Sequence, residues 1–404
     1  MHRRRTCIII ATVVFILVGL NPQPARTQER SGSATRRRTA SRPERRLERA
    51  ATLIREGNLA QAEAEIVSLL EGNPQQPDGL NLLGVIRLRQ ARTDEAEELF
   101  KRSLAAAPRR MGARINLGLL YASLDRLDEA AAQFEAVLKS IPAHRDAQAR
   151  LVDVLRRQAA DALALGEREK ALSHLLRAKT LAPANPQVLF EFGMVALGMS
   201  LYTDAAQALG AARDRQPNEP KVIYALARAK LELGNLADAE RLFRRYVELK
   251  PDDATGYFGL GYVLVLLRRG AEAAPAFEKS LTLRPGQTES PYQLGTIAYA
   301  SGDLEAAARW FEQVLARNDQ HTGALLGMGQ VYFSRKQYEQ ARASLEKAVG
   351  LEPALSKAHY QLGLTLARLG DKEAARHALD TATKLQEEEK NRKRVVLSLS
   401  EQKP

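Results

Sequence analysis

The stretch that decides the fold is residues 220–253, PKVIYALARAKLELGNLADAERLFRRYVELKPDD. Apolar residues recur along it at the helical spacing of three and four, in two successive sets: Ile223, Leu226, Ala227 and Leu231, then Leu236, Ala239, Leu242, Phe243, Tyr246 and Leu249. Gly234 and Asn235 favour a turn between the sets, and Pro251 ends the second one. The stretch therefore predicts two helices, each apolar along one stripe that neighbouring helices must cover.

The same unit recurs along the chain with a period of 34 residues. Steps of 34 mark the unit ends at Pro74, Pro108, Pro142, Pro183, Pro217, Pro251, Pro285, Asp319 and Pro353. Twelve residues before each end, and once more near the C-terminus, stands an alanine: Ala62, Ala96, Ala130, Ala171, Ala205, Ala239, Ala273, Ala307, Ala341 and Ala375. Only the interval from Pro142 to Pro183 breaks the period, because it holds seven extra residues.

Two further columns predict how the helices pack. The first helices carry a small residue near the middle: Gly84, Gly118, Gly193, Ala227, Gly261, Gly295, Gly329 and Gly363. The second helices carry a bulky apolar residue: Ile66, Phe100, Phe134, Leu175, Leu209, Phe243, Phe277, Phe311, Leu345 and Leu379. A small residue lets two helix backbones approach closely, and a bulky one fills the space beside that contact.

With these columns the chain resembles the tetratricopeptide repeat family over about residues 43–389. The resemblance implies an all-α fold, a right-handed superhelical solenoid of about ten helix-turn-helix repeats. It also implies that the first helix of each repeat lines the concave face. The implied activity is the binding of peptides or proteins rather than catalysis.

On this register the repeats lie near residues 43–76, 77–110, 111–144, 145–185, 186–219, 220–253, 254–287, 288–321, 322–355 and 356–389. The first has polar Arg49 where later repeats have leucine, as an end cap requires. The fourth holds the seven extra residues, and its continuous apolar stripe predicts one long first helix that projects beyond its neighbours. The insertion is either simply tolerated or a bend or docking ridge, and both alternatives stay open.

Residues 390–404 are interpreted as a charged C-terminal tail. The charged run that begins at Glu387 extends the final helix into solvent. Val395 to Leu399 alternates between apolar and polar residues, which predicts a short extended segment.

The N-terminus predicts export. MHRRR precedes the uncharged residues 6–20, a run shorter than the roughly 20 residues of a membrane-spanning helix but suited to a signal peptide. Gln23 does not fit the cleavage pattern before Ala25, so residues 1–25 are either a signal peptide or an uncleaved membrane anchor. Residues 26–42 are an Arg-rich linker predicted to be disordered. We expect an extracytoplasmic protein, periplasmic or secreted, with anchoring to the inner membrane as the alternative.

Motifs that carry chemistry are missing from the sequence. The single cysteine, Cys7, excludes a disulfide framework and a cysteine zinc site. The six histidines form no metal-binding motif, and no stretch matches a phosphate-binding loop or a nucleophile elbow. We therefore predict no catalytic residues, no metal, no cofactor and no enzyme activity.

The net charge of +12 belongs mostly to the N-terminal arm. Residues 1–49 hold 12 Arg and 3 Glu, whereas the remaining residues hold 48 basic and 45 acidic groups. Because the repeats are almost neutral, nucleic acid is an unfavoured partner. The expected partners are proteins or peptides, with the membrane as a further partner of the N-terminal segment; the oligomeric state is not predicted.

Aromatic residues recur on the first helices at positions that the resemblance places on the concave face. They are Phe190, Tyr224, Phe258, Tyr262, Tyr292, Tyr299, Phe333 and Tyr360. Such a column suits an extended polypeptide, because each ring covers apolar groups while a hydroxyl meets the backbone. The alternative is that the rings only pack helices together.

The predicted function is a non-catalytic scaffold that binds an extended peptide or a partner protein, in a cell-envelope assembly or secretion system. An accessory subunit of polysaccharide export or synthesis is the alternative, because aromatic rings also stack on sugars. A cytoplasmic nucleic-acid binder that uses the Arg-rich arm is a weaker alternative, since the solenoid is nearly neutral.

Overall fold

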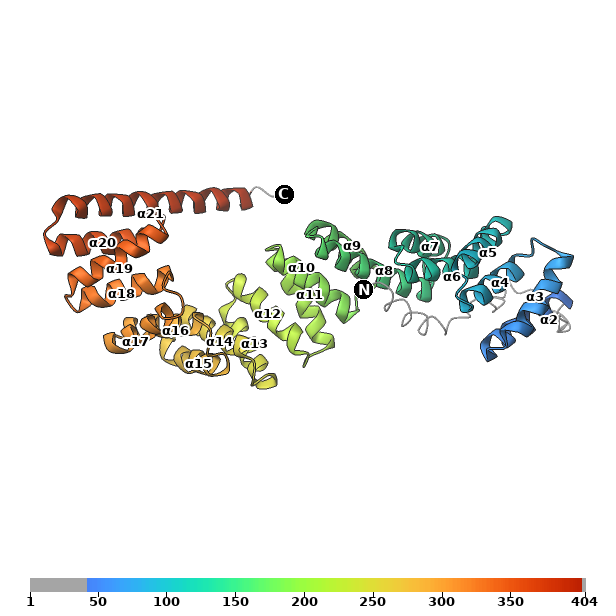
Figure 1. Cartoon of the computed structure of the whole chain (residues 1–404), viewed down its shortest axis with the longest axis horizontal. Coiled ribbons are helices and arrows are strands. Elements are labelled where there is room, and N and C mark those ends of the chain that lie inside the picture. Colours follow the sequence, from blue (N-terminus) through green and yellow to red (C-terminus); the bar gives the residue numbers. More distant parts are fainter. Residues whose placement is uncertain (1–41, 402–404) are drawn as a thin grey trace, which may run out of the picture. The chain divides into compact units, whose positions relative to one another are not determined.

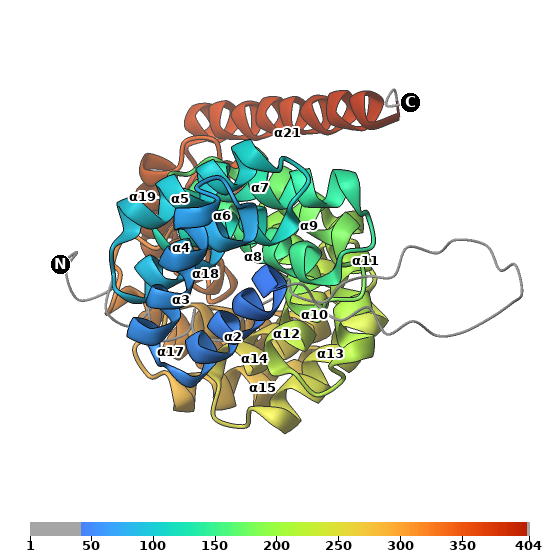
Figure 2. The same ribbon diagram turned by 90° about the vertical axis from the view of Figure 1, so that its right-hand side faces the viewer.

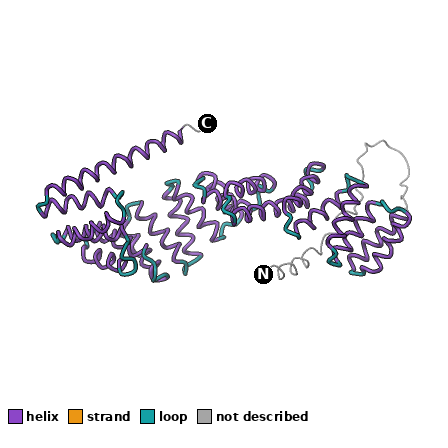
Figure 3. The backbone as a smooth tube through the Cα atoms, turned by 45° about the horizontal axis from the view of Figure 1, so that its top comes forward, coloured by secondary structure: helices purple, strands orange, loops and turns teal. Residues whose placement is uncertain are grey.

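The computed structural model describes residues 42–401, with side chains described through residue 391. The predicted signal peptide or anchor, and the linker up to residue 41, lie outside the described residues. Between residues 42 and 401 the chain consists of helices joined by short turns, without a strand (Figures 1 and 3). The predicted all-α class is confirmed.

The helices belong to two compact units, residues 1–201 and 202–404. The first holds α2 (Arg42–Glu56), α3 (Leu59–Gly72), α4 (Pro77–Arg89), α5 (Thr93–Ala106), α6 (Met111–Ser123), α7 (Leu127–Ser140), α8 (Arg145–Ala164), α9 (Arg168–Leu181) and α10 (Pro186–Gly198). The second holds α11 (Tyr202–Arg215), α12 (Pro220–Glu232), α13 (Leu236–Leu249), α14 (Ala254–Leu266), α15 (Gly270–Leu283), α16 (Glu289–Ala300), α17 (Leu304–Leu315), α18 (Thr322–Ser334), α19 (Tyr338–Leu351), α20 (Ser356–Leu369) and α21 (Lys372–Glu401). Within each unit every helix packs on the next one along the chain, which is the arrangement of a solenoid.

The stretch 220–253 forms the predicted helix pair, α12 and α13. Pro220 occupies the first turn of α12, where its missing N–H costs nothing, and the Glu219 carboxylate accepts a hydrogen bond from the Lys221 N–H. Most of the predicted apolar stripe is buried in α12 and in α13, where Phe243 is 1% exposed, and Leu231, Leu236 and Leu249 near the helix ends are half-buried. Both helices therefore form for the reasons that their sequence pattern indicates.

The turn between the two helices of a repeat has one fixed requirement, a residue in the left-handed region. Ten such residues recur with the repeat: Gly57, Ala91, Asp125, Gly166, Ser200, Gly234, Arg268, Gly302, Lys336 and Gly370, with φ between 59° and 91°. Glycine adopts this conformation without strain, whereas the five other residues pay a steric cost. The backbone of the turn is thus conserved through the array although its residue type is not.

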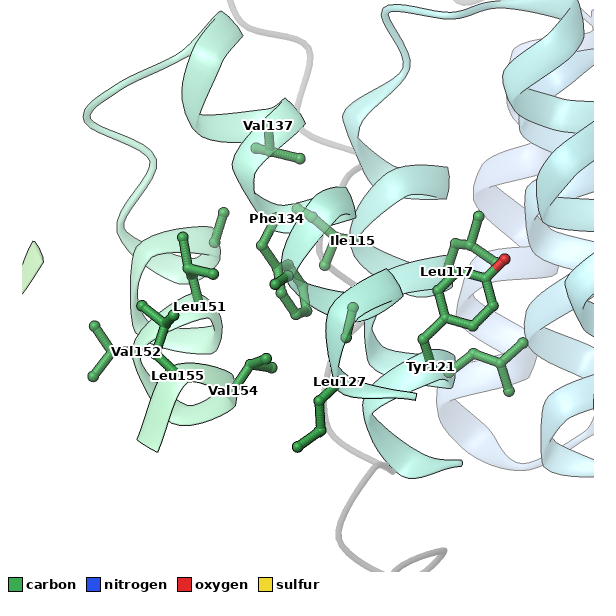
Figure 4. Close-up of a cluster of buried hydrophobic side chains, with 14 of the residues drawn as sticks. Ile115, Leu117, Tyr121, Leu127, Phe134, Val137, Leu151, Val152, Val154 and Leu155 are labelled. Atoms are coloured by element: carbon green, nitrogen blue, oxygen red, sulfur yellow. The ribbon is translucent and has the colours of Figure 1, made fainter. Parts of the chain in front are cut away.

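The small and bulky columns meet face to face, as predicted. A Cβ built on Gly295 would lie 2.6 Å from the Phe311 ring of the same repeat, and one on Gly327 of the next repeat would lie 2.5 Å from it. Phe311 is therefore held between two glycines on successive first helices. Figure 4 shows the corresponding ring of the first unit, Phe134, beside Ile115 in a cluster of buried side chains.

The predicted long first helix of the fourth repeat is confirmed by α8, which has 20 residues where α4, α6 and α10 have 13. Its first part keeps the common register with the preceding repeat. Arg157 donates to the Ala122 carbonyl 35 residues earlier, at 2.7 Å, as Arg89 does to the Ile54 carbonyl, at 3.0 Å and the same separation.

The first helix of the next repeat, α10, packs on α8 in a different register. Arg156 pairs with Glu191 of α10, at 2.8 and 2.6 Å, across the same separation of 35 residues that joins Asn81 to Asn116. Asn81 is the fifth residue of its repeat, whereas Arg156 is the twelfth residue of α8. The seven extra residues therefore displace α10 along α8 by about 10 Å. The insertion is a step in the register of the first unit, and whether it is simply tolerated or serves as a bend or docking ridge stays open.

The C-terminal prediction was wrong in one respect. Residues 395–399 are helical, because α21 continues from Lys372 to Glu401 (Figure 2). Alternation over five residues is a weak signal, and a helix that already exists adds residues at little cost. The predicted extension of the final helix is confirmed, and residues 386–391 are exposed.

Candidate binding surface

The predicted aromatic residues are divided between the two units. Phe190 lies on α10 of the first unit, half-buried. The other seven, Tyr224, Phe258, Tyr262, Tyr292, Tyr299, Phe333 and Tyr360, lie on first helices of the second unit, from α12 to α20. The second unit thus holds the candidate surface, defined here as these seven residues.

One column of the surface is anchored on the core. Tyr224 packs on Phe243 with ring centroids 5.9 Å apart, Phe258 on Phe277 at 5.6 Å, and Tyr292 on Phe311 at 6.2 Å. All three rings are half-buried. Each is therefore fixed against the bulky residue of its own repeat, so that part of its surface serves packing and part faces solvent.

Two of the remaining rings, those of Tyr262 and Tyr360, are more open, whereas Tyr299 and Phe333 are half-buried. Tyr262 is 37% exposed and stacks on Phe258, with centroids 6.3 Å apart and planes 15° apart. Tyr360 is 55% exposed. Further along, the Tyr299 hydroxyl lies 3.3 Å from the Ser334 hydroxyl, and Phe333 packs edge-on against Tyr338 at 5.6 Å.

The equivalent face of the first unit carries polar pairs that the aromatic pattern of the sequence does not indicate. The Asn116 amide donates to the Asn81 side-chain oxygen at 2.9 Å, and Arg110 pairs with Asp78 at 2.7 Å. Burial raises the pKa of Asp78 despite Arg110. Comparison of the same repeat positions in the earlier repeats would have found these residues.

Glu191 is a second charged point of that face. Burial acts to raise the pKa of its carboxyl, but hydrogen bonds from Arg156 and Gln187 outweigh it and hold the pKa below the ordinary value. The pair is therefore ionised at neutral pH and joins α8 to α10.

The described residues include neither a metal-binding cluster nor a helix suited to span a membrane. Residues 42–391 hold no group of three or more His, Cys, Asp or Glu side chains able to bind a metal ion. Among the helices from α2 to α21, none combines the length and the apolar character of a membrane span.

Sequence profiles described as tetratricopeptide repeat match residues 47–110, 87–144 and 224–288, then 298–350 and 356–389. Together they cover more than half of the chain, and the chain belongs to the tetratricopeptide repeat family. The matched ranges leave out residues 145–223, which include the step at α8.

Solved structures of repeat proteins are similar to parts of the chain. MamA 41-end from Desulfovibrio magneticus RS-1 is 24% identical, covering 42% of this chain and 96% of its own, with a TM-score of 0.39. YrrB, described as a TPR protein with an unusual peptide-binding site, is 24% identical over 45% of this chain and 94% of its own, with a TM-score of 0.38. The Cut9–Hcn1 hetero-tetramer of the APC/C matches at 14% identity, 85% of this chain and 87% of that chain, with a TM-score of 0.42. A search of curated proteins found no match.

Proposed function

We propose that the chain is a non-catalytic scaffold that binds an extended peptide, or an extended segment of a partner protein, on the aromatic surface of its second unit. Membership of a repeat family built for protein interaction supports the general class. The observation that carries the particular site is a column of rings anchored on core phenylalanines, with the exposed Tyr262 and Tyr360 beside or beyond it.

Anchored rings suit this task energetically. A side chain whose position is already set by the core loses little conformational freedom on binding, so more of the contact energy appears as affinity. Tyrosine adds a hydroxyl that can meet backbone groups of the ligand. The repeat spacing presents such rings one after another, as an extended chain with regularly placed apolar side chains requires.

The test is selection of peptides from a displayed library against the full chain, followed by titration of the selected peptides. Tyr262→Ala with Tyr360→Ala is expected to weaken binding at least about tenfold, because exposed anchors carry most of such contacts. These two positions are preferable to Tyr224, Phe258 and Tyr292, whose rings also hold the core.

Leu351→Ala is the matched control, since Leu351 is 40% exposed but lies at the end of the second helix α19. Unchanged affinity in the tyrosine variant would refute the site. Selective binding of oligosaccharides instead of peptides, lost in the same variant, would favour the polysaccharide-export alternative.

We further propose that the scaffold works outside the cytoplasm, in envelope assembly or secretion. The support is the order of residues 1–25, a basic start followed by an uncharged apolar run. N-terminal sequencing of the protein recovered from fractionated cells tests this proposal. An intact N-terminus in the soluble cytoplasmic fraction would contradict it.

A further inference from the structure

The first and second helices of the second unit differ in charge. The first helices α12, α14, α16, α18 and α20 carry five basic and two acidic side chains, whereas the second helices α11, α13, α15, α17 and α19 carry nine basic and eleven acidic ones. The seven residues of the candidate surface all lie on the first helices. The candidate surface therefore belongs to the helices that hold the excess of positive charge.

Two of the basic side chains lie beside Tyr224 on α12. Lys221 precedes this ring by three residues and Arg228 follows it by four, so the three side chains lie on one face of the helix. Lys221 and Arg228 are exposed, and within the residues that the structure describes neither side chain forms an ion pair. Both cations are therefore accessible to a ligand that contacts Tyr224.

The charge at this point of α12 is not balanced by a neighbour. Glu232, one helical turn beyond Arg228, is exposed and forms no ion pair with it. Arginines on the second helices behave differently, because Arg244 on α13 and Arg342 on α19 each pair at 2.8 Å with a glutamate one turn away. The unpaired cations thus distinguish the candidate surface from the second helices, where such pairs form.

The same arrangement recurs at the other end of the surface. Lys357 precedes Tyr360 by three residues on α20, as Lys221 precedes Tyr224 on α12, and the two lysines are separated by four repeats of 34 residues. Lys357 is exposed as well, and its ammonium has no ion pair in the described part of the chain. Both ends of the surface therefore combine a tyrosine with an accessible lysine.

The helices between these ends present apolar side chains. On α14, Phe258, Tyr262 and Leu266 follow one another at intervals of four on one face, and Tyr262 and Leu266 are 37% and 45% exposed. Neither α14 nor α18 carries a charged side chain, and α16 carries only Glu289, in its first turn. The candidate surface thus has an apolar centre between two basic ends.

We propose that the peptide bound by this surface has an apolar centre with acidic residues on both sides of it, an inference that rests on the proposed function. Carboxylates meet Lys221 and Arg228 at one end and Lys357 at the other, and apolar side chains lie on the exposed stripe of α14. Helices in contact, such as α12 and α14, lie roughly 10 Å apart, and an extended chain rises about 3.3 Å per residue. The acidic residue at the α12 end is therefore about three residues from the first apolar one.

Charge complementarity favours a peptide of this kind over other anions. An unpaired cation beside a ring steers a carboxylate and fixes the register of the ligand, while apolar contacts contribute most of the affinity. A nucleic acid has a phosphate at every nucleotide and no apolar side chain for α14, and Glu289 would repel a continuous line of negative charge. The alternation of basic and apolar regions matches an alternation of acidic and apolar residues.

Two synthetic peptides of about 12 residues test the inference by titration against the full chain. One has glutamates at both ends and leucine and valine in the centre, and the other has glutamine in place of glutamate. Both are acetylated and amidated, so that only side-chain carboxylates are negative. The acidic peptide is expected to bind at least about tenfold more tightly, and the difference should shrink between about 0.05 and 0.5 M salt.

Charge reversal assigns the preference to the named cations. Lys221→Glu with Arg228→Glu should weaken binding of the acidic peptide at least about tenfold and leave the glutamine peptide within about threefold. Addition of Lys357→Glu to this variant should reverse the preference, so that a third peptide with lysine in place of glutamate binds more tightly than the acidic one. A gain of binding of this kind cannot come from a loss of folding.

The matched control is Lys279→Glu with Arg309→Glu, which makes the same change in net charge at exposed positions of the second helices α15 and α17. Its affinity for the acidic peptide should stay within about threefold of the parent chain. Equal affinity of the acidic and glutamine peptides overturns the inference, and so does an equal loss in the control.

The library selection separates this inference from the proposed function. Selected peptides that need Tyr262 and Tyr360 but carry no acidic residues overturn the inference and leave the proposed function standing. If no peptide depends on these two tyrosines, the proposed function fails and the inference fails with it. Tighter binding of a single-stranded oligonucleotide, lost in the variant of Lys221 and Arg228, assigns the cations to nucleic acid and also overturns the inference.

Discussion

The first helices of the two units pack through the same small and bulky columns, but they differ in the residue type at one other repeat position. At one and the same repeat position, the second unit carries Tyr224, Phe258, Tyr292, Leu326 and Tyr360, and the first unit carries Leu47, Asn81, Ile115, Ala149 and Phe190. The small and bulky columns that hold helices together recur in both units. Packing therefore constrains those columns, whereas the position of Tyr224 varies. It is aromatic in most repeats of the second unit, but in the first unit only at Phe190 on α10.

The largest expected effect comes from removal of a core ring in each unit, and it tests whether both units depend equally on these rings. Phe134→Ala and Phe311→Ala remove rings that are at most 2% exposed, and each should cost about 3–5 kcal/mol of unfolding free energy. Urea denaturation measures the cost, and amide hydrogen exchange locates it. Tyr360→Ala, at an exposed ring, should cost less than about 0.5 kcal/mol. A large loss in only one unit would show that the packing plan is not shared.

A smaller effect concerns the ion pairs between repeats, which both units have. Glu97 of the first unit receives hydrogen bonds from Arg126 at 2.7 Å and from the Tyr121 hydroxyl at 3.1 Å, and pairs with Lys101 at 2.7 Å. The hydrogen bond from Arg126 is the main cause that lowers the pKa of Glu97 from 4.5 to about 2, against the opposing effect of burial. Glu240 of the second unit is held similarly, by Arg269 at 2.7 Å.

Because the folded pKa of Glu97 is depressed, its contribution is present above pH 4.5 and is lost as the pH falls toward 2. Glu97→Gln should lower the unfolding free energy at pH 7 by about 1–2 kcal/mol, after allowance for solvent at the half-exposed Arg126. The variant should also flatten the acid dependence in that window. Urea denaturation at pH 7 and at pH 3 measures both. An acid dependence parallel to that of the parent chain would show that Glu97 is not the group responsible.

The smallest effect concerns the turn that every repeat shares. Arg268 is exposed and adopts φ 59°, whereas the preceding repeat has Gly234 at φ 72°. Arg268→Gly relieves the steric cost but adds chain entropy to the unfolded state, so a gain of about 0.5–1 kcal/mol is expected. Gly234→Ala, which replaces a glycine of the same turn by a residue with a side chain, should lower the unfolding free energy by a similar amount. Thermal denaturation compares the two, and destabilisation by Arg268→Gly would refute the requirement.

Much of the fold could be predicted from the sequence because the same residue types recur at the packing positions of each repeat. Pro251 and its equivalents end helices, and Gly295 with Phe311 can meet only where a backbone approaches a ring. The left-handed turn could not be read in the same way. Ala91, Asp125 and Lys336 all adopt it, because the flanking helices impose the conformation whatever the side chain.

The candidate site was predictable only in part. The spacing of the rings located the column, but its anchoring on Phe243, Phe277 and Phe311 depends on side-chain packing that no spacing specifies. The pairing of Arg156 with Glu191 was hidden for another reason. It exists only because α10 is displaced along α8, and the size of a displacement is a property of the packed helices.

The step at α8 also limits what can lie along the first unit. A straight extended ligand that contacts equivalent positions on α4 and α6 reaches α10 two helical turns away from the matching position. It would have to shift sideways by about 10 Å or end there. Removal of seven residues from α8 would bring α10 back to the position along α8 that α6 has along α4. Each side chain of α8 would stay on the same side of the helix, because seven residues are close to two complete turns. The insertion therefore interrupts the row of equivalent positions along the first helices of the first unit, and its seven residues set the size of that offset.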